Sequence, residues 1–60
     1  MTANTIDIET MELIGHIGAT GGLFAAVKAL IAGGYAADKT GAERIAALKT
    51  AANFCIDFVS

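Results

Sequence analysis

The sequence predicts an all-α protein of two helices, or of three if the chain breaks near Gly21–Gly22, joined by a short charged turn and packed in a homo-oligomer. Three observations support this fold class. Large apolar residues recur at three- and four-residue steps, no segment alternates with the period of a strand, and a helix-start signal follows a polar turn near residue 40. Residues 1–60 are expected to form a single helical unit.

The composition favours an ordered chain that needs partners. Hydrophobic residues make up 55% of the 60 residues, and charged residues make up 17%, against about 25% in an average soluble domain. A chain this short buries only about 60% of its unfolded surface, so a lone monomer is marginally stable. The net charge of −2 argues against nucleic acid as a partner, because such binding depends on cations that neutralise phosphates.

Residues 1–12 are predicted to form an acidic amphipathic start. Asn4 is a candidate N-cap, because its side chain can accept a hydrogen bond from an unpaired N–H at a helix start. Glu9, Glu12 and His16 then share one side of the helix. The apolar residues on the other side are Ile6, Leu13, Ile14 and Ile17.

Residues 13–37 form a Gly/Ala-rich apolar segment that contains six of the seven glycines and no acidic residue. As one helix it would reach roughly 37 Å, enough to cross a hydrocarbon layer of about 30 Å. Lys28 lies near its middle, where a charge costs about 2.5 to 3.5 kcal/mol on insertion and cancels most of the apolar gain. We therefore expect the segment to depend on neighbouring helices, with a membrane as its partner at some stage.

The same segment has one bulky face and one smooth face. The large side chains of the bulky face share one helical arc and are Leu23, Phe24, Val27, Leu30 and Ile31. Small residues spaced three and four apart, the first two as GxxxG, allow close contact between helices in membranes. This pattern predicts a self-association face, and its members are Gly18, Gly22, Ala25, Ala29 and Gly33.

Residues 38–41 are predicted to form a polar turn and residues 42–59 an amphipathic helix. Thr40 and Glu43 match a capping box, in which a hydroxyl and a carboxylate each pair with an amide at the helix start. The predicted apolar positions of this helix follow three- and four-residue steps and are Ile45, Leu48, Ala52, Cys55 and Val59.

No group of residues predicts catalysis or a cofactor. Glu9, Glu12 and His16 could meet a metal ion, but two carboxylates and one imidazole on a helix face also occur commonly as a solvated surface. A single His, a single Cys55 and a single Tyr35 do not make a nucleophile, base and orienting group. We expect no enzyme, no metal site and no cofactor.

The predicted function is therefore structural. The acidic start, the Gly/Ala-rich middle and the charged segment after it resemble the layout of major coat proteins of filamentous phages. The charged turn between two apolar helices is similar to that of pilins of conjugative type IV secretion systems. Both resemblances imply a subunit that packs in many copies, in a membrane-associated or extracellular assembly.

Two other classes stay open. One is a soluble cytoplasmic helical hairpin that dimerises into a four-helix bundle, in which the last helix meets the bulky face of the middle one. The other is a secreted membrane-active peptide released after Gly21–Gly22, because residues 23–60 carry four basic and three acidic groups.

Overall fold

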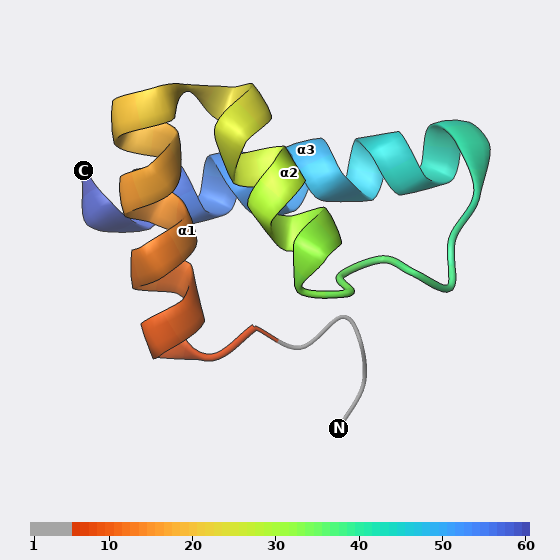
Figure 1. Ribbon diagram of the computed structural model, residues 1–60, viewed down its shortest axis with the longest axis horizontal. Helices are drawn as coiled ribbons and strands as arrows, with labels where there is room; N and C mark the ends of the chain where they lie inside the picture. Colours follow the sequence, from red (N-terminus) through yellow and green to blue (C-terminus); the bar gives the residue numbers. More distant parts are fainter. Residues whose placement is uncertain (1–5) are drawn as a thin grey trace.

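Residues 6–60 form three helices in the computed structural model, which describes this part of the chain. Helix α1 spans Ile8–Gly21, α2 spans Leu23–Ala32 and α3 spans Gly41–Val59. No strand occurs between residues 6 and 60, so the predicted all-α class is confirmed there. In Figure 1, α3 runs horizontally, and α1 and α2 cross it. Each helix contacts the other two, in a compact globule of 28 × 23 × 16 Å.

Helix α1 is capped by Asp7. The Asp7 carboxylate accepts a hydrogen bond from the backbone N–H of Thr10 at 2.8 Å, and the Asp7 backbone is extended, as at most helix N-caps. Hydrogen bonding from the side chain and backbone of Thr10 lowers the pKa of Asp7, because it favours the charged carboxylate. Asn4, the predicted N-cap, lies outside the described residues.

Gly22 separates α1 from α2. Its φ of 91° lies in a region that favours glycine, and its N–H still closes α1 by donating to the Gly18 carbonyl at 2.8 Å. The Gly22 carbonyl in turn accepts from the N–H groups of Ala25 and Ala26, which starts α2. The apolar stretch 13–37 is therefore not one helix, and the three-helix alternative is the one observed (Figure 1).

The division shortens both halves of the apolar stretch. Helix α1 has 14 residues and α2 has 10, which correspond to about 21 Å and about 15 Å of helix. In the described part of the chain, none of the helices combines the length and the apolar character needed to cross a membrane.

A turn over residues 33–40 links α2 to α3. Gly34 has a φ of 83°, and the N–H groups of Gly34 and Tyr35 donate to the carbonyls of Ile31 and Leu30, both at 3.0 Å. These bonds satisfy carbonyls at the end of α2, as in other helix ends that use a left-handed glycine. The turn thus starts before the predicted polar segment 38–41 and includes Ala36, which is buried.

Helix α3 begins at Gly41, one residue before the predicted start of the helix at residue 42. Thr40 is its N-cap and has an extended backbone, but its side chain makes no capping hydrogen bond. The predicted capping box is wrong in this respect. The Thr40 carbonyl instead accepts from the Arg44 N–H at 3.4 Å, and Gly41 starts the helix with a φ of 57°. The helix start thus depends on the backbone conformation at Thr40 and Gly41.

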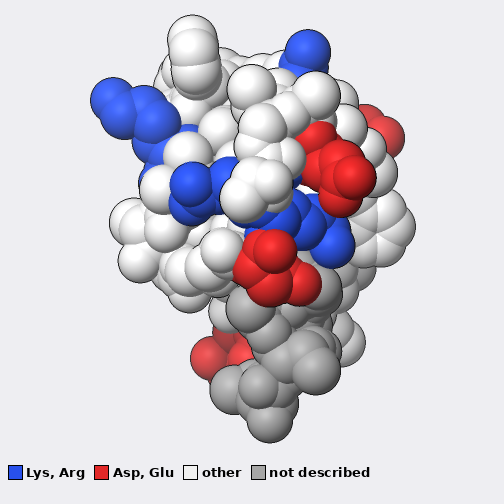
Figure 2. Space-filling view, turned by 90° about the vertical axis from the view of Figure 1, so that its right-hand side faces the viewer, with Lys and Arg blue, Asp and Glu red and all other residues white. Residues whose placement is uncertain are grey.

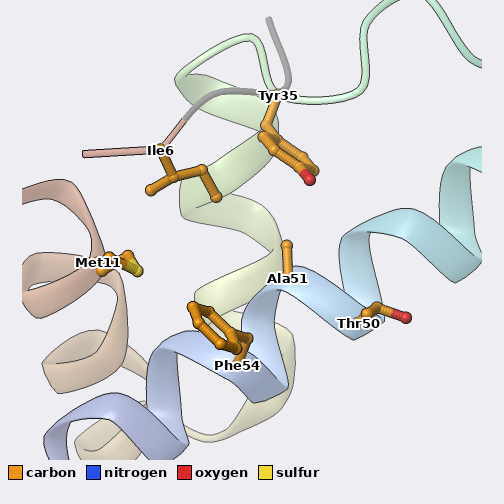
Figure 3. Close-up of a pocket in the computed structure, with 6 residues that line it drawn as sticks. All are labelled: Ile6, Met11, Tyr35, Thr50, Ala51 and Phe54. Carbon is orange, nitrogen blue, oxygen red and sulfur yellow. The ribbon is translucent and has the colours of Figure 1, made fainter. Parts of the chain in front are cut away.

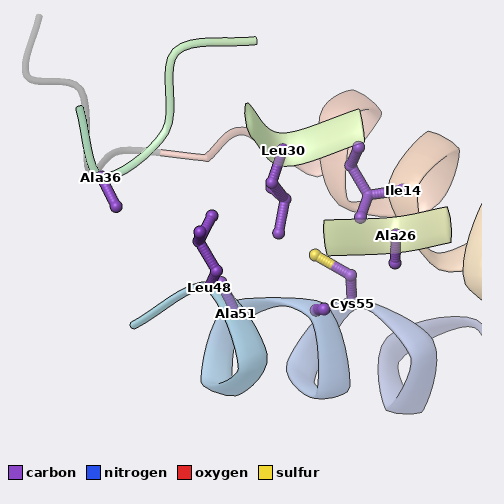
Figure 4. Close-up of a cluster of buried hydrophobic side chains, with 8 residues drawn as sticks. Ile14, Ala26, Leu30, Ala36, Leu48, Ala51 and Cys55 are labelled. Atoms are coloured by element: carbon purple, nitrogen blue, oxygen red, sulfur yellow. The ribbon is translucent and has the colours of Figure 1, made fainter. Parts of the chain in front are cut away.

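The core is small and lies between the three helices (Figure 4). Leu30 points from α2 toward α3, and the Cys55 thiol lies between these helices. Four of the eight buried apolar residues are alanines, so the helices approach closely with little side-chain volume between them. The buried residues are Ile14, Ala26, Leu30, Ala36, Leu48, Ala51, Ala52 and Cys55.

Two glycines let α1 lie directly on α3. A Cβ on Gly15 would overlap the carbonyl oxygen of Cys55, and it would come within 2.8 Å of Val59 Cγ1. A Cβ on Gly18 would meet the side chain of Ile56. The absence of side chains at both positions therefore places α1 against the second half of α3.

Candidate functional site

The five small residues predicted to form a self-association face lie on separate parts of the chain. Gly18 is buried in α1, and its close contact is with Ile56 of the same chain. Ala25 and Ala29 are half-buried on α2. Gly22 and Gly33 lie at the two ends of α2, outside the helix. These residues do not form one continuous helix face, and their role in self-association stays a prediction.

A groove between α2 and the first half of α3 is the leading candidate site. It has a volume of about 490 Å³, and nearly all of its lining is apolar. Helix α2 supplies a stripe at helical spacing, and α3 supplies a shorter one. The lining residues are Leu23, Phe24, Val27, Ile31, Ile45, Leu48 and Lys49.

The rim of this groove exposes large side chains. Phe24 is 80% exposed, Ile45 is 60% exposed and Ile31 is 43% exposed. Phe24 and Ile31 are seven residues apart on α2 and therefore lie on the same side of that helix. Single apolar side chains scattered over a surface are normal. Exposed apolar side chains that lie together, as they do here, are typical of an interaction site.

The charged residues placed at the groove are lysines. Lys49 lines the groove, and the exposed Lys28 is four residues after Phe24 on α2, where it falls next to the rim. None of the groove-lining residues in the described chain is acidic. Figure 2, which views the side of the molecule where α3 begins, shows basic side chains across that face with some carboxylates beside them.

A second hollow lies on the other flank of α3, close to the start of α1 (Figure 3). Its volume is about 320 Å³. The side chains of Ile6, Met11, Tyr35 and Phe54 border a common space, with Thr50 and Ala51 at the α3 side. Phe54 is 61% exposed, so apolar surface also extends over this flank.

The residues considered for metal binding lie on the exposed side of α1. Glu9, Glu12 and His16 are all exposed. Between residues 6 and 60, no three His, Cys, Asp or Glu side chains are close enough together to hold a metal ion. Cys55 is fully buried, and this burial raises the pKa of its thiol.

The exposed rim was not anticipated from the sequence. Leu23, Phe24, Val27, Leu30 and Ile31 were predicted to share one bulky face, but only Leu30 is fully buried and Phe24 and Ile31 face outward. Their spacing would have revealed this only if the orientation of α2 after Gly22 had been known. Leu13 was likewise expected on the apolar side of its helix and is 61% exposed.

Comparison with known proteins does not assign the chain to a family. No family model matches it, and neither a curated protein nor a solved structure is significantly similar to it.

Proposed function

We propose that this protein is a small structural subunit that associates with further copies of itself by helix packing, through the groove between α2 and α3. The observation that carries the proposal is the exposure of Phe24, Ile31 and Ile45 around that groove. A copy that covered these side chains would bury apolar surface, which is the main driving force of protein association.

The small core supports the same proposal. A chain of 60 residues gains little stability from its own core, and here half of the buried apolar residues are alanines. Burying a fully exposed Phe or Ile side chain contributes about 1.5 to 3 kcal/mol. Covering the rim of the groove would therefore add stabilisation that is large compared with the few kcal/mol expected for a domain of this size.

A four-helix-bundle dimer is the second candidate, and one observation favours it. Both α2 and α3 contribute to the groove, so two copies joined groove to groove would place four helices around one apolar centre. The coat-like and pilin-like layouts, the membrane-associated or extracellular location and release of a peptide after Gly22 stay predictions.

Sedimentation equilibrium of the parent and of Phe24→Ser tests the proposal. The parent should form oligomers, and Phe24→Ser should weaken association at least about tenfold, because a difference of 1.4 kcal/mol already changes an equilibrium constant by that factor. Since Phe24 is 80% exposed, the variant should keep the circular dichroism spectrum of the parent.

Phe54→Ser is the matched control, because Phe54 is also largely exposed but lies at the other hollow. It should associate like the parent. A monomeric parent at millimolar concentration would overturn the proposal. Loss of association in Phe54→Ser alone would move the interface to the hollow near the start of α1.

A further inference from the structure

We propose that copies join head to tail, with the exposed side of α1 in one copy docking into the α2–α3 groove of the next. This inference depends on the proposed self-association and names the surface that fills the groove. It rests on the opposite charges of the two surfaces, on the apolar side chains that each exposes, and on their separation within one copy.

The first half of α1 carries an acidic patch with exposed apolar residues, here called the α1 patch and made of Ile8, Glu9, Glu12 and Leu13. All four are exposed, and Ile8 and Leu13 are each 61% exposed. Ile8 and Glu12, like Glu9 and Leu13, are four residues apart and are therefore neighbours on the helix surface. The patch thus presents aliphatic and negative groups together.

The groove offers the complementary chemistry. Its lining is apolar, and Lys49 is its one charged lining residue. The exposed Lys28 is four residues after Phe24 and is therefore its neighbour on the surface of α2. An aliphatic side chain such as Leu13 can pack against Phe24 and Ile31, while Glu9 and Glu12 approach the lysines. Arranging opposite charges across an interface selects the correct partner and fixes its register.

The two surfaces cannot meet within one copy. Helix α1 lies on the second half of α3, where Gly15 contacts Cys55 and Val59. The groove lies over the first half of α3, at Ile45 and Leu48. The α1 patch is also on the side of its helix that faces away from the core, so a groove that accepts it belongs to another copy.

A contact between different surfaces has a structural consequence. Each copy keeps a free patch at one end and a free groove at the other, so the contact repeats and builds a ring or a filament. A groove-to-groove dimer, by contrast, would bring Lys28 and Lys49 of both copies together, with no acidic residue among the described groove-lining residues to offset them.

Charge reversal followed by mixing tests this arrangement. One variant carries Glu9→Lys and Glu12→Lys, and the other carries Lys28→Glu and Lys49→Glu. Each should lose association at least about tenfold on its own, because like charges then meet at every contact. An equimolar mixture should assemble again, because the positive patch of the first variant then meets the negative groove of the second. The parental patch of the second variant likewise meets the parental groove of the first. Assembly of the parent should also weaken as salt rises from about 0.1 M to about 1 M.

The matched control reverses two other exposed carboxylates, with Asp38→Lys and Asp57→Lys. It changes the net charge by the same amount as the patch variant and should associate like the parent. If Glu9→Lys/Glu12→Lys associates like the parent while Phe24→Ser does not, the head-to-tail arrangement is wrong and self-association through the groove stands. A monomeric parent would overturn both.

Sedimentation with lipid vesicles tests the alternative that a membrane, and not another copy, occupies the groove. Vesicles of phosphatidylcholine with about one third phosphatidylglycerol present an anionic surface that lysines near an apolar face can bind. The parent should stay in the supernatant at concentrations where it self-associates. If a monomeric parent pellets with these vesicles and Lys28→Glu/Lys49→Glu does not, an anionic membrane occupies the groove and the inference is overturned.

Discussion

Gly15 of α1 lies directly against the backbone carbonyl of Cys55 in α3, with no space between them for a methyl group. This contact brings the axes of the two helices close together and lets Ile14 reach the core beside Cys55. It also explains why α1, whose glycines lower its helix propensity, is held by packing on α3.

Gly15→Ala should destabilise the protein although alanine is the better helix former. The added Cβ would overlap the Cys55 carbonyl and come within 2.8 Å of Val59 Cγ1, and overpacking of this kind costs about 1 to 3 kcal/mol. The gain in helix propensity is about 1 kcal/mol. Because the clash is with backbone that cannot rotate away, we expect the cost to exceed the gain, with a net loss of up to about 2 kcal/mol in the free energy of unfolding, measured by urea titration.

Gly33→Ala is the control for this substitution. Gly33 has a φ of −82°, and a Cβ there would make ordinary contacts at 3.6 Å with the carbonyl oxygens of Ala29 and Leu30. Alanine should therefore be neutral or stabilising by about 0.4 to 1 kcal/mol. Equal destabilisation by both substitutions would show that the close contact of Gly15 with α3 is not the cause.

Acid should loosen the start of α1. The pKa of Asp7 is lowered in the folded protein, so the cap contributes stability above the ordinary value near 3.8 and loses it as the pH falls through the lower folded value. The protection factor of the Thr10 amide, which compares its exchange rate with that of an unstructured chain at the same pH, should then fall in the parent as the pH drops below 3.8. Asp7→Asn keeps an oxygen acceptor without a titrating group, so its exchange should lack this pH-dependent step.

The order of the helices could be predicted from the sequence, but the orientation of their faces could not. Helix α3 was predicted with nearly correct bounds, because Thr40 and the three- and four-residue spacing of its apolar residues are local signals. The break at Gly22 could only be left open, since a glycine pair is tolerated inside a helix as well as between helices.

The candidate site required information that the local pattern lacks. Gly18 and its neighbours predict close helix contact, but a small residue contacts a helix of its own chain as readily as one of another copy. In the fold, Gly18 contacts Ile56. The rotation of α2 after Gly22 then decides that Leu30 is inside and that Phe24 and Ile31 are outside. Gly22, another member of that predicted face, has a φ of 91°, so any side chain placed there would strain the backbone whether or not copies associate.

Cys55 should react slowly with thiol reagents in the native protein. It is fully buried, and burial raises its pKa, so both access and thiolate formation are suppressed. The raised pKa also means that the thiol contributes stability below its ordinary pKa of 9.0 and that this contribution falls as the pH rises toward the folded value. Labelling at about pH 8 should be far faster in urea than in buffer. An exposed cysteine on the same helix, Asn53→Cys in a Cys55→Ala background, should label fast in both.

Leu30 and Ile31 are adjacent, similar in size and opposite in environment, so truncating each separates folding from association. Leu30 is 2% exposed in the core, and Leu30→Ala should cost about 2 to 5 kcal/mol through lost burial and a cavity. At about 0.05 to 0.15 kcal/mol per residue, that is a large part of the total stability of this chain.

Ile31 is 43% exposed, and Ile31→Ala should cost less than about 1.5 kcal/mol in dilute monomer. Because Ile31 borders the groove, its truncation should weaken self-association while leaving the circular dichroism spectrum unchanged. Urea titration at low concentration and sedimentation at high concentration measure the two effects, and a larger loss of unfolding free energy in Ile31→Ala than in Leu30→Ala would contradict the orientation of α2.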